Sequence, residues 1–304
     1  MIRPFIPVLC AGLLLAGCAS QKTTPDPTPA SSEAPKAPEV AQVPASKRFY
    51  AEMTKRSLHQ RALSFPIDVD VDPSAYKPCE VRVDHTNGVE VRRLAFDDEG
   101  RLNQIVLTQL APDQSVRASR TMTMEYDAQD NLTKLAFDNG VSTTFGYDAG
   151  IMNRATLINP ARSSKLDSTV THSSSGNTVL LEQILPEGAQ GPPVQMAYTY
   201  DDKGRLIFKA LGPKLPRAQW IYKDGSPQII EHYPKEFGNF KDTYTVQDGK
   251  LQSAIRAIRT EDDSFSAIEE ATFIYEGDRL SSAKRVDPNT GKQLEAIAYI
   301  YTCQ

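Results

Sequence analysis

The residues that could carry out chemistry are few in this chain of 304 residues, and most of them stand apart from one another. Its four histidines are His59, His85, His172 and His232. None has a second histidine, a cysteine or a carboxylate at a recognisable metal-ligand spacing. We therefore predict no metal site and no cofactor.

Two short stretches look like fragments of known sites but lack the remaining parts. Residues 68–72 (DVDVD) begin like a calcium loop, but Pro73 stands where glycine is needed and Cys79 where the bidentate glutamate belongs. Alternating aspartates on an exposed strand are the better interpretation. Residues 281–284 (SSAK) satisfy Ser-x-x-Lys but follow a hairpin turn and have no partner motif. We predict no catalytic residue, and a hydrolase would need a carboxylate arrangement that no motif indicates.

A different kind of chemistry is predicted at Cys18. Residues 1–17 contain one charge, at Arg3, then an apolar run and small residues, which is the order of a secretory signal. The run is too short to cross a hydrocarbon core of about 30 Å. Its end, Leu15-Ala16-Gly17-Cys18, resembles the lipobox of bacterial lipoproteins. The alternatives are a signal peptide cut elsewhere or an uncleaved anchor.

The lipobox resemblance implies a lipid anchor. In that family the signal is cleaved before the cysteine, whose thiol is diacylated and whose new amino group is usually acylated too. Ala19, not aspartate, follows Cys18. This favours the outer membrane over the inner one if the host has two membranes.

Residues 18–46 read as a spacer between the lipid and a folded part. Residues 19–46 hold six prolines and no aromatic side chain, so they cannot bury enough apolar surface to offset the entropy of ordering. At about 3.1 Å per residue, this spacer could reach roughly 85 Å.

Residues 47–64 change to a basic helix. The segment 47–63 (KRFYAEMTKRSLHQRAL) lacks Gly and Pro, Ser46 can cap its start, and Pro66 lies just past its end. Its net charge is +4, whereas residues 65–304 carry about −8. Two roles remain open: a solvated lid packed on its own domain by a few apolar residues such as Met53, or a contact with an acidic lipid or wall polymer.

Residues 65–304 are predicted to form an all-β domain. From residue 80 onward, apolar residues alternate, as in Val81 and Val83, and short turn pairs such as Asn87-Gly88 and Asp248-Gly249 separate the strands. We expect an antiparallel meander of hairpins that is curled, two-layered or barrel-like. Trp220 and most of the twelve tyrosines fall within strand patterns, where packing in the core or against a neighbouring strand is expected in preference to a stacking platform.

An internal repeat supports this fold. Residues 96–102 (FDDEGRL) match residues 200–206 (YDDKGRL), residues 126–132 (YDAQDNL) are a variant, and residues 246–251 and 275–280 are shorter copies. The aromatic ends one strand, aspartate accepts hydrogen bonds in the turn, and glycine or asparagine takes a positive φ. Leucine then begins the next strand and should face the aromatic residue across the hairpin.

These units resemble the YD repeats of the RHS family, with the core Tyr-Asp-x-x-Gly-Arg-Leu, loosely over residues 90–300. In long RHS proteins many such hairpins form a shell around a toxin. Here the copies are irregularly spaced, with 30 residues from Gly100 to Asp130 and 74 from there to Gly204. The resemblance therefore implies the hairpin unit, and a large cocoon is not expected.

Cys79 and Cys303 flank the strand-rich region. If the chain is exported, an oxidising setting favours a disulfide between them over two free buried thiols. Their Cα atoms must then lie within about 7 Å of each other, so that the ends of the meander meet.

Composition narrows the function further. Hydrophobic residues make up 40% and charged residues 24%, as in ordinary globular proteins, and the net charge of −4 argues against nucleic-acid binding. We predict a membrane-anchored envelope lipoprotein that acts as a non-enzymatic binding or scaffold module. Its expected partners are the membrane, through the lipid, and an envelope protein or cell-wall polymer. A carrier that encloses a hydrophobic ligand in a closed sheet is the alternative.

Overall fold

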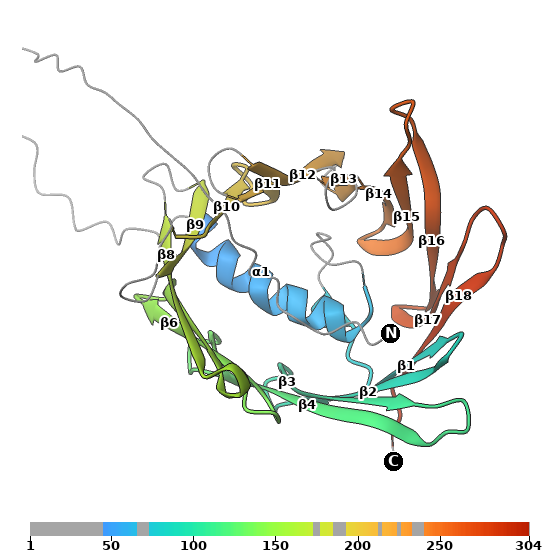
Figure 1. Cartoon of the computed structure of the whole chain (residues 1–304), viewed down its shortest axis with the longest axis horizontal. Coiled ribbons are helices and arrows are strands. Elements are labelled where there is room, and N and C mark those ends of the chain that lie inside the picture. Colours follow the sequence, from blue (N-terminus) through green and yellow to red (C-terminus); the bar gives the residue numbers. More distant parts are fainter. Residues whose placement is uncertain are drawn as a thin grey trace, which may run out of the picture.

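An antiparallel sheet of eighteen strands closes on itself around helix α1 (Ala45–Ala62) (Figure 1). The structure, a computed structural model, describes residues 45–65, 73–172, 177–184, 193–211, 215–223, 226–232 and 240–303. The proposed signal and lipobox, the spacer up to residue 44 and the acidic stretch 68–72 lie outside the described residues.

Every strand pairs with the next one along the chain, and the last strand pairs with the first. The strands are β1 (Glu80–His85), β2 (Gly88–Phe96), β3 (Leu102–Leu110), β4 (Val116–Tyr126), β5 (Leu132–Phe137), β6 (Ser142–Asp148), β7 (Ile151–Asn159), β8 (Ser164–His172), β9 (Thr178–Ile184), β10 (Gln195–Tyr200), β11 (Leu206–Leu211), β12 (Leu215–Lys223), β13 (Ser226–His232), β14 (Phe240–Gln247), β15 (Lys250–Arg259), β16 (Phe265–Glu276), β17 (Arg279–Val286) and β18 (Gln293–Ile300). Two short 3₁₀ helices, η1 (Pro73–Ala75) and η2 (Pro160–Arg162), interrupt the connections. The barrel-like form of the predicted all-β meander is thus confirmed.

The repeat predicts the pairing at the hairpin ends correctly. Phe96 faces Leu102, Tyr126 faces Leu132 and Tyr200 faces Leu206. In each hairpin the register shifts immediately before the aromatic residue. Such β-bulges bend a strand and increase its twist. A bulge in each of these hairpins therefore helps the sheet to curl.

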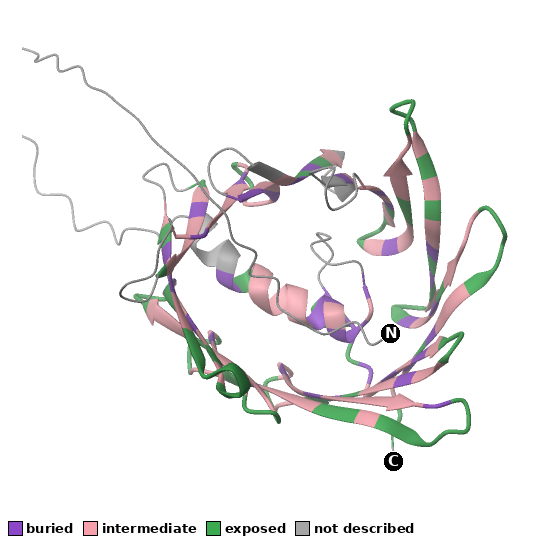
Figure 2. Ribbon diagram, viewed as in Figure 1, coloured by how far each residue is buried: buried purple, intermediate pink, exposed green. Residues whose placement is uncertain are grey.

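The core lies on the inner side of the sheet. The leucines that follow the turns are buried, with Leu132 1% and Leu251 and Leu280 0% exposed. Trp220, Tyr200, Tyr244 and Tyr299 are also buried. This confirms the expected packing role for Trp220 and these tyrosines. Figure 2 shows exposed residues gathered in the hairpin turns and buried residues along the strands and on the C-terminal half of α1.

Helix α1 differs from the prediction in its start and its position. It begins at Ala45, so Ser46 lies within the helix and is not its N-cap, and it ends at Ala62. It packs on its own domain, but inside the closed sheet and not as an external, solvated lid (Figure 1). Gln60 is 0% and Ala62 2% exposed, and Ala62 belongs to the cluster of buried core residues.

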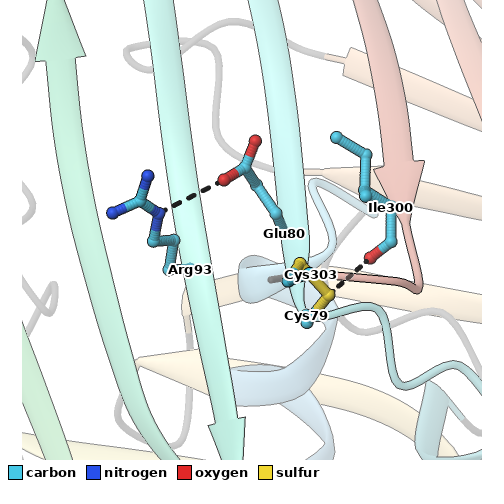
Figure 3. Close-up of a disulfide and its surroundings, with 5 residues drawn as sticks. All are labelled: Cys79, Glu80, Arg93, Ile300 and Cys303. Atoms are coloured by element: carbon cyan, nitrogen blue, oxygen red, sulfur yellow. Dashed lines mark hydrogen bonds and ion pairs between the residues drawn. A yellow bond between two sulfur atoms is a disulfide. The ribbon is translucent and has the colours of Figure 1, made fainter.

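The sheet closes where β18 meets β1. Cys79, just before β1, and Cys303, just after β18, form a disulfide with Cα atoms 6.1 Å apart (Figure 3). The backbone N–H of Cys79 donates to the Ile300 carbonyl of β18, and its carbonyl accepts from the Leu94 N–H of β2. We call the strands β1, β2, β17 and β18 the seam. Beside the disulfide, Arg93 of β2 pairs with Glu80 of β1 at 3.3 Å (Figure 3).

Within the residues described, no helix combines the length and the apolar character needed to cross a membrane.

Candidate functional site

The turn between β2 and β3 shows what the repeated residues do. The Asp97 carboxylate accepts the Arg101 backbone N–H at 2.8 Å through Oδ1 and the Arg101 Nε at 2.7 Å through Oδ2. Gly100, with φ +78°, donates its N–H to the Asp97 carbonyl. Burial alone would raise the pKa of Asp97, but the hydrogen bonds and charge of Arg101 hold that pKa below its usual range.

The other two long copies repeat this arrangement. In the turn between β10 and β11, Asp201 accepts the Arg205 backbone N–H at 2.8 Å and the Arg205 Nε at 2.7 Å. In the turn between β4 and β5, Asn131 replaces arginine and donates to Asp127 through both its backbone N–H and its side chain, each at 2.9 Å. Asp130 takes the positive φ there, at 64°.

The repeat also connects each hairpin to the next. The Arg101 guanidinium lies 4.9 Å from the centre of the Tyr126 ring, and the Tyr126 hydroxyl donates to the Leu102 carbonyl at 2.8 Å. Arg205 and Tyr222 make the same two contacts, at 4.3 Å to the ring and 2.7 Å to the carbonyl of the leucine after the turn. The hydroxyls of Tyr147 and Tyr275 donate in the same way to Leu132 and Leu251.

Sequence reasoning assigned the arginine and the tyrosine hydroxyl no role. The sequence does contain a signal for this contact, namely the spacing between arginine and tyrosine. Two strands separate the arginine of one turn from the tyrosine that it contacts, as between Arg101 and Tyr126. A cation over an aromatic ring and a hydroxyl bonded to a carbonyl need residues from two hairpins, so neither can be read from one copy of the repeat.

The seam holds the C-terminal end of α1. Arg92 donates to the carbonyls of Arg61 and Ala62, Arg285 donates to that of Ser64 at 2.9 Å, and the Tyr299 hydroxyl donates to that of Leu63 at 2.8 Å. The last carbonyls of a helix have no partner within it and carry partial negative charge, so two guanidinium groups there are favourable.

Acidic residues balance these cations. Arg92 pairs with the buried Glu90 at 2.6 Å, and Arg285 pairs with Glu295 at 3.2 Å. Glu295 also accepts a hydrogen bond from His85 at 3.2 Å. That hydrogen bond raises the pKa of His85 and, together with the charge of Arg285, lowers the pKa of Glu295.

The middle of α1 meets the turn between β4 and β5. The Lys55 ammonium donates to the Asp130 carbonyl at 2.9 Å and its carboxylate at 2.8 Å, and pairs with Glu52 at 2.9 Å. Burial alone would lower the pKa of Lys55, but these two carboxylates raise it, so the ammonium stays charged. Lys55 of the basic helix therefore forms an ion pair with an acidic residue of the sheet domain.

A pocket of about 270 Å³ opens between α1 and the turns of β2–β3 and β4–β5. We call it the α1 pocket. Its charged rim is formed by Glu52, Lys55, Arg56, Arg101 and Asp130, and its apolar wall by Leu58, Leu102, Met124 and Tyr126. Burial raises the pKa of Tyr126 to about 12, so its hydroxyl stays protonated as a hydrogen-bond donor.

The structure does not bring the histidines together. His59 is buried with Nε2 2.9 Å from the Tyr76 carbonyl, His172 lies on β8 with Nε2 3.3 Å from the Met152 carbonyl, and His85 faces Glu295. The side chain of His232 lies outside the described residues. Across the described part of the chain, no group of three or more His, Cys, Asp or Glu residues could hold a metal ion.

The Ser-x-x-Lys stretch lies in β17. The Ser281 hydroxyl donates to the Ile274 carbonyl of the neighbouring strand at 3.1 Å. The Ser281 hydroxyl therefore forms a hydrogen bond between two neighbouring strands of the sheet.

No protein-family model matches the chain, and neither does any curated protein. Among solved structures, the chain is similar to TcdB2-TccC3-Cdc42, with 17% identity and a TM-score of 0.34 over 69% of this chain, and it spans 12% of that chain's length. It is also similar to a porin-like protein from Bacteroides uniformis ATCC 8492, with 12% identity and a TM-score of 0.40 over 76% of this chain and 100% of that chain. A porin-like protein from Bacteroides vulgatus ATCC 8482 is similar as well, with 11% identity and a TM-score of 0.38 over 75% of this chain and 99% of that chain. These are likenesses, and no family assignment follows from them.

Proposed function

We propose that this chain is a membrane-anchored envelope lipoprotein whose folded part acts as a non-enzymatic binding or scaffold module. The closed sheet with α1 bound inside it carries this proposal. A closed sheet exposes no unpaired edge strand, which suits a protein that must stay folded and unaggregated outside the cytoplasm. Asp97, Asp201 and Lys55 are among the ionisable residues that hold turns and the helix in place.

The lipid anchor is the part of the proposal that rests on sequence. Cys18 and the proline-rich spacer would place α1 and the sheet at the end of a tether. The expected result is fatty-acid labelling of the wild type and none of Cys18→Ala. Labelling that persists in Cys18→Ala would overturn the anchor.

The proposed setting also requires the Cys79–Cys303 disulfide to form in the exported protein. Non-reducing peptide mapping of the native protein should recover the two cysteine-containing peptides joined. If both thiols can be alkylated without reduction, the oxidising setting is wrong.

The binding or scaffold role is tested by crosslinking in intact cells, with Cys18→Ala as the matched control. A specific partner captured by the wild type and lost or reduced in the untethered variant supports the role. If no protein or wall polymer is captured reproducibly, the scaffold role loses its support.

The carrier of a hydrophobic ligand is the second candidate, because a closed sheet can enclose a ligand. The presence of α1 against the inner wall favours the scaffold, since the helix occupies space that such a ligand would need. Native mass spectrometry of the delipidated protein separates the two. A stoichiometric apolar molecule supports the carrier, and its absence supports the scaffold.

A further inference from the structure

The α1 pocket has the size and the side chains of a binding site. It is formed by four separate parts of the chain, namely α1, η1, the β2–β3 turn with the start of β3, and the end of β4 with the β4–β5 turn. Its volume of about 270 Å³ lies just below that of typical small-molecule sites, which run from roughly 300 to 1,000 Å³. A matching ligand is therefore smaller than a drug-sized molecule.

Arg101 supplies an oriented cation on one side of the pocket. Asp97 and Glu99 hold its Nε and Nη2 at 2.7 and 3.0 Å, and its planar group lies over Tyr126. Its Nη1 lies 3.8 Å from Asp130, beyond hydrogen-bonding distance. Nη1 can therefore donate to a carboxylate that enters the pocket, in a charge-assisted hydrogen bond.

Glu52 and Asp130 supply two carboxylates beside Lys55, and Asp130 is also the carboxylate that lies 3.8 Å from Arg101. Each is 55% exposed, whereas the Lys55 side chain between them is 17% exposed. The Lys55 ammonium has three donors, and its contacts to Asp130 and Glu52 use all three. Lys55 therefore fixes the spacing of the two carboxylates, whose remaining oxygens can accept from a ligand ammonium.

Apolar residues line the pocket together with these charged groups. Leu58 comes from α1, and Met124 and Tyr126 come from β4. Such a surface suits a short apolar side chain. A simple anion would be attracted by Arg101 but repelled by Glu52 and Asp130. A simple cation would be attracted by the two carboxylates but repelled by Arg101.

We propose that the α1 pocket binds a small zwitterion with an apolar side chain, of the size of a dipeptide. Its carboxylate meets Arg101, its ammonium group meets Glu52 and Asp130, and its side chain packs against Leu58 and Met124. This assignment rests on the proposed binding role and names its ligand class, and it is independent of the lipid anchor.

The test is calorimetric titration of the full chain with the dipeptide alanyl-leucine. Two matched probes each lack one charge: the N-acetylated dipeptide has no ammonium group, and the C-amidated dipeptide has no carboxylate. We expect the zwitterion to bind at least tenfold more tightly than either blocked form. Absence of binding, or equal binding of all three probes, would overturn the proposal.

Arg101→Gln and Arg205→Gln form a matched pair of variants. Both arginines hold an aspartate in the same turn geometry and lie over a tyrosine, and their side chains are 25% and 22% exposed, but only Arg101 lines the α1 pocket. Arg101→Gln should weaken alanyl-leucine binding at least tenfold, while Arg205→Gln leaves it unchanged. Equal weakening by both would mean that the effect comes from the fold, and would overturn the site.

The outcome can be separated from that of the proposed function. If alanyl-leucine binds as described but crosslinking captures no partner, the pocket stands and the scaffold role fails. If a partner is captured but the dipeptide does not bind, the scaffold role stands and the pocket assignment fails.

Discussion

The turns 97–101 and 201–205 are two copies of one motif in two different surroundings. Their internal hydrogen bonds agree within 0.1 Å, and in both the arginine lies over the tyrosine of the next hairpin. The second hairpin meets α1 through Tyr200, whose hydroxyl lies 3.8 Å from Met53 Sδ. Only the first lies beside Asp130, and only its arginine lines the α1 pocket. The motif therefore determines the turn and the link to the next hairpin, whereas the neighbouring elements determine whether the same arginine also lines a pocket.

The largest expected effect comes from the leucine that follows each turn. Leu102 is 5% and Leu206 8% exposed, so both Leu102→Ala and Leu206→Ala should lower the free energy of unfolding, each by about 2–5 kcal/mol. Urea unfolding measures both losses. If only one variant is destabilised, the two hairpins are not structurally equivalent and the comparison fails.

The aspartate at the start of each turn should have the next largest effect. Asp97→Ala and Asp201→Ala each remove bonds to one backbone N–H and to a guanidinium, at a cost of about 1–3 kcal/mol. Thermal or urea unfolding at neutral pH measures this cost.

The same two aspartates predict a pH dependence. Both have a pKa held below the usual 3.8, so each stabilises the fold above that value and loses its contribution as the pH falls through its lowered pKa. The gap between wild type and Asp97→Ala should therefore narrow in acid. A gap that is constant down to pH 2 would contradict the assigned role.

The link between hairpins should be worth less than the turn. Tyr126→Phe and Tyr222→Phe each remove one hydroxyl that donates to a carbonyl, so each should cost about 0.5–1.5 kcal/mol. Urea unfolding of the two variants gives the value for each hairpin. A Tyr126→Phe variant as stable as the wild type would show that its hydroxyl bonds equally well to water.

The smallest effect is expected at His85 and Glu295 of the seam. The pKa of His85 in the folded protein is raised above 6.5, so protonated His85 contributes its full stabilisation below pH 6.5. This stabilisation is lost as the pH rises through the raised pKa. The pKa of Glu295 in the folded protein is lowered below 4.5, so ionised Glu295 stabilises the fold above pH 4.5. This stabilisation is lost as the pH falls through the lowered pKa.

His85→Gln should therefore lower Tm most between about pH 4.5 and 6.5. A series of melting curves across this range checks the prediction, and Thr86→Ala serves as a control in the adjacent turn. A difference in Tm between wild type and His85→Gln that grows above pH 8 would contradict the prediction.

Much of the fold could be predicted because its determinants are local. The alternation of Val81 with Val83 and the repeated turn residues predict strands and hairpins, and the aromatic residue faces leucine as the repeat implies. The positions of Cys79 and Cys303 also indicated that the two ends of the sheet meet.

The position of α1 and the candidate site could not be predicted in the same way. Residues 47–63 predict a helix and its charge, but the carbonyls of Ala62 and Ser64 bind Arg92 and Arg285, the latter 221 residues away from Ser64. Likewise, the Lys55 ammonium donates to the Asp130 carboxylate, although the two residues are 75 positions apart in the sequence. Such contacts depend on how the closed sheet brings distant residues together, and no local pattern encodes them.

Hydrogen exchange of residues 51–62 tests most directly whether α1 is held inside the closed sheet. We expect the amides at the C-terminal end of α1, near Gln60 and Ala62, to exchange as slowly as those of β2 and β17, because Arg92, Arg285 and Tyr299 hold this end on the seam. Arg92→Gln should accelerate exchange in α1 more than in β2. Exchange of α1 as fast as that of a solvent-exposed helix, with protected strands around it, would contradict the account.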